Sequence, residues 1–174
     1  APLPTHGLAE HTAFSKGVSL VRPPSLLFVC LGNICRSPLA EAAFRDAAAR
    51  AGLEAVADSA GTGEWHVGHP PDPRSQAVAR AHGIDISGYK ARRVRGEDFT
   101  RFDHILALDP QNLRDLLAIA PPGTTARLSL LMDHVPGRAG QGVRDPYYGG
   151  ERDFQAVWDD ARVAAEALVG MLRG

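Results

Sequence analysis

The sequence predicts a doubly wound α/β domain, with a parallel sheet of about four strands and helices on both faces. Short apolar runs alternate with segments of helical period, which is typical of β-α-β units. The first run, residues 26–31, is apolar throughout, as expected for a strand buried on both faces. A short loop and a helix start follow it directly, at a strand end where such folds bind ligands.

The first half of the chain has the pattern of one β-α-β unit. Residues 38–51 are rich in alanine and carry apolar side chains at helical spacing, and Gly52 is a natural end for this helix. Residues 54–59 return to a strand pattern. We therefore expect a phosphate-binding loop between the first strand and the first helix.

The second half continues the alternation. Asp72 and Pro73 are typical of a helix start, so we expect residues 73–82 to be helical. The other expected elements are a helical turn at 97–99, a strand at 104–108, a helix at 110–120 capped by Asp109, a strand at 126–131 and a long helix at 154–172. No repeat or linker divides the chain, so we expect one domain over residues 26–174.

Composition restricts the possible partners. The 174 residues include 44% hydrophobic and 22% charged residues, with a formal net charge of −1. This balance favours neither nucleic acid nor an anionic membrane as a partner, and no apolar run approaches the roughly 20 residues that span a bilayer. We expect a monomer. Residues 1–25 lack the layout of a signal peptide and are expected to be an N-terminal extension, natural or left from cloning.

The two cysteines, Cys30 and Cys35, lie five positions apart. This spacing is neither a disulfide framework nor a zinc-binding pattern, so we expect no metal. The default compartment for such a chain is a reducing cytoplasm, and export by a route without a signal peptide is the alternative. The abundance of alanine, arginine and glycine suggests a bacterial source.

Residues 30–38 carry the spacing Cys-x5-Arg between Cys30 and Arg36. A loop of this length can turn its backbone N–H groups inward to form an anion nest. Ser37 fits an N-cap and Pro38 fits the first helical position, which would aim the positive end of the helix at the same point. Helix N-termini and cations stabilise thiolates, so we expect Cys30 to be a thiolate at neutral pH. Arg36 can bind two phosphoryl oxygens at once.

The other loop residues have supporting parts. The Ser37 hydroxyl can donate to the sulfur, and Gly32 permits close approach of the backbone to a ligand. Asn33 tolerates the left-handed conformation, and its amide can close the loop. The residues expected to line the phosphate site are Leu31, Gly32, Asn33, Ile34, Cys35 and Ser37.

The loop resembles the signature loop of the low-molecular-weight protein tyrosine phosphatases, and the resemblance covers nearly all of the chain from about residue 26. Three further stretches carry it: Ser59-Ala60-Gly61-Thr62 with Trp65, Asp72-Pro73-Arg74, and Asp145-Pro146-Tyr147-Tyr148-Gly149. It implies that Cys30 is the nucleophile, Arg36 the phosphate clamp and Asp145 the general acid. It also implies a phosphocysteine intermediate, a phosphotyrosine-containing protein as substrate, an oxyanion in the loop and no metal or other cofactor.

Asp145 fits the part of the acid on its own chemistry. A phenolic leaving group needs a proton, which a carboxyl group can give before taking one from the attacking water. Pro146 restricts the backbone of Asp145 to extended conformations. Tyr147 and Tyr148 can stack on a phenyl ring, and Trp65 can form the opposite wall. A deep slot of this kind would accept phosphotyrosine and leave the shorter phosphoserine unreached.

Several of these residues have simpler interpretations. Cys35 either packs at the helix start or forms a reversible disulfide with Cys30 that protects the nucleophile. Trp65 can be a core residue, and Tyr147 and Tyr148 can be ordinary turn residues. The histidines, including His66 and His69, have no partners at metal-ligand spacing and are expected to be solvated.

One position departs from the family pattern. Many relatives have a histidine before the Lys-Ala-Arg stretch that supports the loop asparagine, and this chain has Tyr89 there. We expect its hydroxyl, together with Ser59, to support Asn33 instead. The basic segment at residues 89–95 is either a solvated surface or a rim that attracts acidic partners.

Three other functions are weighed against phosphotyrosine hydrolysis. A thioredoxin-coupled arsenate reductase shares the fold but needs further cysteines, and none follows Cys35. Phosphoarginine phosphatases tend to have threonine where Ile34 stands and lack the paired tyrosines Tyr147 and Tyr148. A non-catalytic phosphotyrosine-binding module would not need all of Cys30, Arg36 and Asp145.

Overall fold

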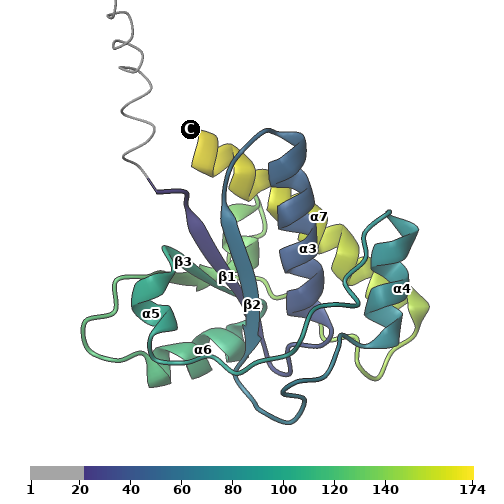
Figure 1. Ribbon diagram of the computed structural model, residues 1–174, viewed down its shortest axis with the longest axis horizontal. Coiled ribbons are helices and arrows are strands. Elements are labelled where there is room, and N and C mark those ends of the chain that lie inside the picture. Colours follow the sequence, from purple (N-terminus) through teal and green to yellow (C-terminus); the bar gives the residue numbers. More distant parts are fainter. Residues whose placement is uncertain (1–21) are drawn as a thin grey trace, which may run out of the picture.

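A four-stranded parallel sheet forms the centre of the computed structural model, which describes residues 22–174 (Figure 1). The strands are β1 (Ser25–Cys30), β2 (Val56–Gly61), β3 (His104–Ala107) and β4 (Arg127–Leu130), in the order β2-β1-β3-β4. Every neighbouring pair is parallel. The doubly wound fold predicted from the sequence is therefore confirmed. The expected N-terminal extension lies, up to residue 21, outside the described residues.

Helices cover both faces of this sheet (Figure 1). The side chains of β1 alternate between the faces: Leu26 and Phe28 belong to one buried cluster, and Leu27 and Val29 belong to another. The first cluster includes residues of α3 (Arg36–Arg50), α4 (Pro73–Ala81), η1 (Leu131–His134) and α7 (Glu151–Arg173). The second includes residues of α5 (Asp98–Arg101) and α6 (Pro110–Ile119). Burial of β1 on both sides explains its unbroken apolar run.

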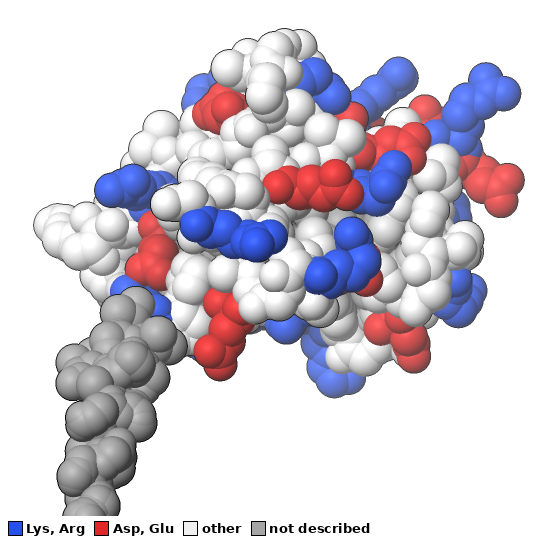
Figure 2. Space-filling model, turned by 90° about the horizontal axis from the view of Figure 1, so that it is seen from above, with Lys and Arg blue, Asp and Glu red and all other residues white. Residues whose placement is uncertain are grey.

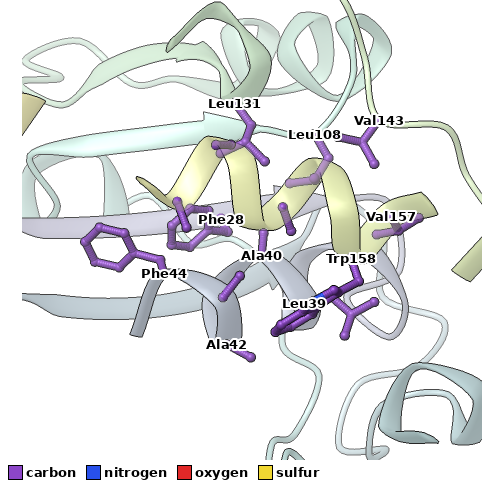
Figure 3. Close-up of a cluster of buried hydrophobic side chains, with 14 of the residues drawn as sticks. Phe28, Leu39, Ala40, Ala42, Phe44, Leu108, Leu131, Val143, Val157 and Trp158 are labelled. Carbon is purple, nitrogen blue, oxygen red and sulfur yellow. The ribbon is translucent and has the colours of Figure 1, made fainter. Parts of the chain in front are cut away.

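Aliphatic side chains make up most of the larger cluster, with a few large aromatic rings among them (Figure 3). Phe28 of β1 and Phe44 of α3 are almost fully buried, and their ring centroids are 5.8 Å apart. Trp158 of α7 is buried next to α3 and stacks on His82 with a centroid distance of 4.8 Å. This packing holds α3 against the sheet, and with it the loop that precedes α3.

The helix starts show where local sequence is sufficient. Asp72 accepts a hydrogen bond from the N–H of Arg74, and Asp109 accepts one from that of Asn112, so both expected caps are confirmed. Ser37, however, is not an N-cap: α3 already begins at Arg36, after Cys35. Its hydroxyl is engaged by other groups of the loop and is not free to bond the helix N–H groups.

The basic segment is largely neutralised by neighbouring carboxylates. Arg92 is mostly buried and bonds both Asp58 and the fully buried Asp98. Arg93 lies 3.3 Å from Glu64. On the face shown in Figure 2, positive and negative side chains are interspersed. These pairs favour a structural part for Arg92 over a rim that attracts acidic partners.

Two kinds of feature are absent from residues 22–174. No helix there has the length and hydrophobicity needed to cross a bilayer. No three His, Cys, Asp or Glu side chains in that range gather into a group that could hold a metal ion.

Candidate active site

Asn33 shapes the loop between β1 and α3. It has a φ of 59°, and no other non-glycine residue within 22–174 has a positive φ. Its amide nitrogen donates to the hydroxyls of Ser37 at 2.8 Å and Ser59 at 3.0 Å. Its oxygen accepts from the backbone N–H of Arg92 at 3.0 Å. The left-handed conformation expected of this residue is therefore confirmed, and its side chain ties the loop to two other segments.

Glu41 supports this arrangement and was missed by sequence reasoning, which saw only an ordinary helix position. It is buried on α3, accepts from the Ser59 hydroxyl at 2.8 Å and accepts from Arg45 at 2.8 Å. Burial raises its pKa above the usual range, against the effect of both hydrogen bonds. Within residues 22–174, the Tyr89 hydroxyl does not make the expected hydrogen bond to Asn33. Asn33 donates to the Ser59 hydroxyl instead, and that hydroxyl donates to Glu41.

Close packing under the loop depends on Gly61. This residue ends β2, directly beside Cys30 of β1. A Cβ atom on Gly61 would stand 2.7 Å from the Leu31 carbonyl oxygen, which is closer than real side chains approach. The glycine therefore allows the loop backbone to lie against the end of β2.

Cys30 is the last residue of β1, at the carboxyl end of one of the two inner strands. Its sulfur lies 3.1 Å from the Ser37 hydroxyl oxygen, within hydrogen-bond distance. Because α3 begins at Arg36, unpaired N–H groups of its first turn face this end of the sheet. An anion held beside the sulfur would be stabilised by them.

Arg36 is held by partners far away in sequence. Its side chain is only 3% exposed, and Nη1 donates to Asp109 at 2.6 Å and to the Val143 carbonyl at 3.0 Å. Burial acts to lower the pKa of Arg36. The effects of Cys30 and Asp109 together outweigh burial, so the pKa is raised above its usual value. Asp109 was expected only as a helix cap. The hydrogen bond that Asp109 accepts from Arg36 has no signal in the local sequence, because the two residues meet only when β3 packs beside β1.

Asp145 reaches the same point from a segment without regular secondary structure. Its Oδ2 lies 3.6 Å from Nη2 of Arg36. Its Oδ1 accepts from the backbone N–H of Tyr147 at 3.1 Å. Upstream, the N–H of Val143 donates to the Leu108 carbonyl at 2.7 Å. The structure thus brings together the predicted thiol, guanidinium and carboxyl group.

These groups open into one cavity of about 380 Å³. Trp65 is 70% exposed at its wall, which excludes the alternative of a core residue. Tyr147 and Tyr148 also line it, with their rings edge to face at a centroid distance of 5.0 Å. Tyr148 is 97% exposed, so it is free to meet a ligand at the mouth. The cavity is lined by Cys30, Leu31, Gly32, Ile34, Cys35, Arg36, Trp65, His66, Asp145, Tyr147 and Tyr148.

Comparison with known proteins agrees with this geometry. The family model described as low molecular weight phosphotyrosine protein phosphatase matches residues 25–173. The chain belongs to this family. It is 44% identical over 151 residues to the low molecular weight protein-tyrosine-phosphatase YfkJ of Bacillus subtilis, covering 86% of this chain and 96% of the relative. It is also 44% identical over 138 residues to the human low molecular weight phosphotyrosine protein phosphatase, covering 77% and 86%.

Two solved phosphatase structures superpose closely on this chain. The protein tyrosine phosphatase from Entamoeba histolytica, with Hepes in its active site, has a TM-score of 0.81 and 38% identity, covering 86% of this chain and 97% of that one. The Drosophila arginine phosphatase has a TM-score of 0.81 and 31% identity, covering 86% and 98%.

His66 is a second site residue of this phosphatase that sequence reasoning missed. It was expected to be solvated, but it is partly buried and lines the cavity. Its ring carbon Cδ2 lies 3.0 Å from the point where a Cβ of Gly32 would stand. A side chain at position 32 would press on this ring, which would have to shift by a few tenths of an ångström. The sequence did offer one indication that His66 belongs to the site, since it directly follows Trp65.

Cys35 is a free, buried cysteine in this phosphatase. Burial, with Asp72 and Cys30 nearby, raises the pKa of its thiol to about 12. The thiol is therefore protonated at neutral pH.

Proposed function

We propose that this chain hydrolyses phosphotyrosine in protein substrates through a phosphocysteine intermediate. The observation that carries the proposal is the placement of Arg36 between the loop of Cys30 and the carboxyl group of Asp145, 3.6 Å away. All three side chains line one cavity. A buried guanidinium between a thiol and a carboxyl group suits a phosphoryl group that must be attacked on one side and protonated on the other.

In the proposed first step, the Cys30 thiolate attacks phosphorus and forms a P–S bond. The bond from phosphorus to the phenolic oxygen breaks, and Asp145 gives its proton to that oxygen. Arg36 and the first-turn N–H groups of α3 stabilise the equatorial oxygens as charge builds on them. The dephosphorylated tyrosine side chain then leaves as a neutral phenol.

In the proposed second step, water attacks the phosphocysteine. The Asp145 carboxylate takes a proton from this water, the P–S bond breaks, and inorganic phosphate leaves. The Ser37 hydroxyl, 3.1 Å from the sulfur, stabilises the departing thiolate of Cys30. The enzyme returns to its starting state with one ester bond hydrolysed and one water consumed.

The substrate class follows from the walls of the cavity and from the names of the relatives. Trp65 and Tyr147 offer aromatic faces to a phenyl ring, and relatives at 44% identity are named for phosphotyrosine or protein tyrosine. The test is release of phosphate from phosphotyrosine peptides, from phosphoserine peptides and from p-nitrophenyl phosphate, in the presence of a metal chelator. We expect turnover of the first and third alone, and Cys30→Ser should abolish it. Turnover that persists in Cys30→Ser would refute the proposal.

Phosphoarginine hydrolysis is the second candidate, because the Drosophila arginine phosphatase shares the fold at 31% identity. Ile34 in the loop and the paired aromatic residues Tyr147 and Tyr148 favour phosphotyrosine instead. Matched peptides with phosphotyrosine or phosphoarginine at one position decide between them by kcat/KM. A binding module would hold both peptides without releasing phosphate.

We further infer a reducing compartment such as the cytoplasm, since both cysteines are free thiols. A bacterial source is inferred from the abundance of alanine, arginine and glycine, and we propose that the protein acts as a monomer. The balanced net charge of −1 supports a phosphoprotein substrate without nucleic acid or membrane as a second partner.

A further inference from the structure

Arg74 makes an unusual set of contacts at the start of α4. Its Nε and Nη2 donate to both carboxylate oxygens of Asp72, at 3.0 and 2.9 Å. The same guanidinium donates to two backbone carbonyls of another segment, those of Tyr147 at 3.1 Å and Gly149 at 3.2 Å. It also lies 4.4 Å from the ring centroid of Phe154 and 5.7 Å from that of Tyr147. One side chain thus joins α4 to the turn that follows Asp145.

The α4 end of this connection is fixed to the phosphate-binding loop. The backbone N–H of Asp72 donates to the Ile34 carbonyl at 2.9 Å. The hydroxyl of Ser75, buried in the first turn of α4, donates to the Cys35 carbonyl at 3.2 Å. Any movement of Arg74 relative to the loop would therefore strain these bonds.

The other end of the connection reaches the acid itself. Asp145 bonds the backbone N–H of Tyr147, whose carbonyl is one of the two that Arg74 holds. The stretch from η1 to α7 has no helix or strand hydrogen bonds to fix it. Upstream of Asp145, two hydrogen bonds hold this stretch at Val143. The Val143 N–H donates to the Leu108 carbonyl, and the Val143 carbonyl accepts from Arg36. Downstream, Arg74 holds it, and α4 lies beside the start of α7 (Figure 1).

We propose that Arg74 is a positioning residue that sets the distance between the Asp145 carboxyl group and the phosphate-binding loop. The proposal rests on the proposed part of Asp145 as the general acid. Arginine is required because its planar fork can bond a carboxylate with two nitrogens and still direct donors at two carbonyls. Lysine has a single charged nitrogen and cannot hold both partners in this geometry.

Removal of the guanidinium should leave the helix intact. The backbone N–H of Arg74 donates to Asp72 at 2.8 Å, and a non-proline replacement keeps this cap. Arg74→Met keeps an unbranched apolar stem on Phe154 while deleting every side-chain hydrogen bond. The loss then falls on the acid-bearing turn.

The experiment measures kcat/KM for two esters, because this parameter includes departure of the leaving group. Phenyl phosphate needs protonation of its leaving oxygen, and p-nitrophenyl phosphate needs it much less. For Arg74→Met we expect a loss of about tenfold or more on phenyl phosphate and of less than about threefold on p-nitrophenyl phosphate. Arg74→Lys should show the same split, and thermal unfolding reports whether either variant is folded.

Two further proteins make the test specific. Arg80→Met alters an exposed arginine in the last turn of the same helix, and we expect wild-type kinetics from it. In an Asp145→Asn background, adding Arg74→Met should change kcat/KM for phenyl phosphate by less than about twofold, because no acid is left to position. Equal losses on both esters, or a full additional loss in that background, would overturn the part assigned to Arg74. If Asp145→Asn itself shows no difference between the esters, it is the acid assignment that fails.

Discussion

Arg36 decides the chemistry at the scale of single residues. A buried guanidinium is costly unless its charge is paired and its donors are bonded. Asp109 and the Val143 carbonyl satisfy one edge of it, while the other edge faces Asp145 and the cavity. This leaves Arg36 rigid but still able to bind an oxyanion. A phosphoryl group would replace the distant contact to Asp145 with two short, charge-assisted bonds.

Asp109→Asn tests whether the charge of Asp109 is needed to hold Arg36 in this orientation. Asparagine caps a helix as well as aspartate does, so α6 should keep its start and the thermal midpoint should change little. The charge that orients Arg36 is lost, and we expect kcat/KM for p-nitrophenyl phosphate to fall by about tenfold to a hundredfold. Asp115→Asn changes an aspartate of α6 that bonds Gln111 and not Arg36, and it is the matched control. Full activity in Asp109→Asn would show that Arg36 needs no charged partner there.

Asp145→Ala tests the acid. We expect kcat/KM for phosphotyrosine to fall by roughly 10²–10⁴-fold. The loss on p-nitrophenyl phosphate should be much smaller, because its leaving group departs without a proton. Equal losses on the two esters would mean that Asp145 is not the proton donor.

At the scale of the element, the N-terminus of helix α4 is the part that contacts the site. Asp72 caps the helix, pairs with Arg74 and holds the phosphate-binding loop through its backbone. Hydrogen bonds from Arg74 lower the pKa of Asp72 below its usual range, although partial burial acts in the opposite direction. A carboxyl group with a lowered folded pKa contributes stability above its unfolded pKa and loses it as pH falls through the folded value.

Asp72→Asn should therefore cost stability only where the aspartate is ionised. At pH 7 we expect the variant to be less stable by about 1 kcal/mol in free energy of unfolding, since asparagine keeps the cap but loses the charge. The difference should narrow steadily below about pH 4, where unfolded aspartate becomes protonated. Urea unfolding at a series of pH values measures it. Asp46→Asn, which removes an exposed ion pair with Arg50, should show almost no difference at any pH; a gap for Asp72→Asn that is independent of pH would contradict this account.

At the scale of the whole molecule, the buried faces of β1 position the side chains that line the cavity. Parallel strands end at the same edge, so Cys30 at the end of β1, Asp109 after β3 and the segment bonded to Leu108 all meet there. Phe28, packed on Phe44, holds α3 against this sheet. The site is thus a product of the core as much as of its own residues.

Phe28→Ala should destabilise the protein by about 3–5 kcal/mol, through lost burial and the cavity that remains. Because a domain of this size has only about 5–15 kcal/mol of stability, the variant should also lose activity on mild heating. Chemical unfolding measures the first effect, and residual activity after incubation measures the second. Leu117→Ala removes a side chain that is 58% exposed and should change stability by less than about 0.5 kcal/mol. Similar costs for the two variants would mean that Phe28 is not part of the core.

Much of the fold could be predicted because its signals are local. An apolar run long enough for one strand, an Asp-Pro pair and a helical period each depend on a few neighbouring residues. The start of α3 could not be placed, because the Ser37 hydroxyl bonds Asn33 and faces Cys30 instead of capping the helix. Glu41 gave no signal, since only the approach of Ser59 from β2 makes its burial favourable.

The amino-acid sequence alone determined the order of strands and helices, the Cys-x5-Arg loop and the family to which it belongs. Those properties rest on contacts between residues close together in the chain. Only the tertiary structure decided that Asp109 and Asp145 flank Arg36, and that Arg74 joins the turn after Asp145 to the loop. Such pairs are brought together by the packing of parallel strands and of α4 beside α7, and a distance through space between residues so far apart in the chain has no signature in their spacing.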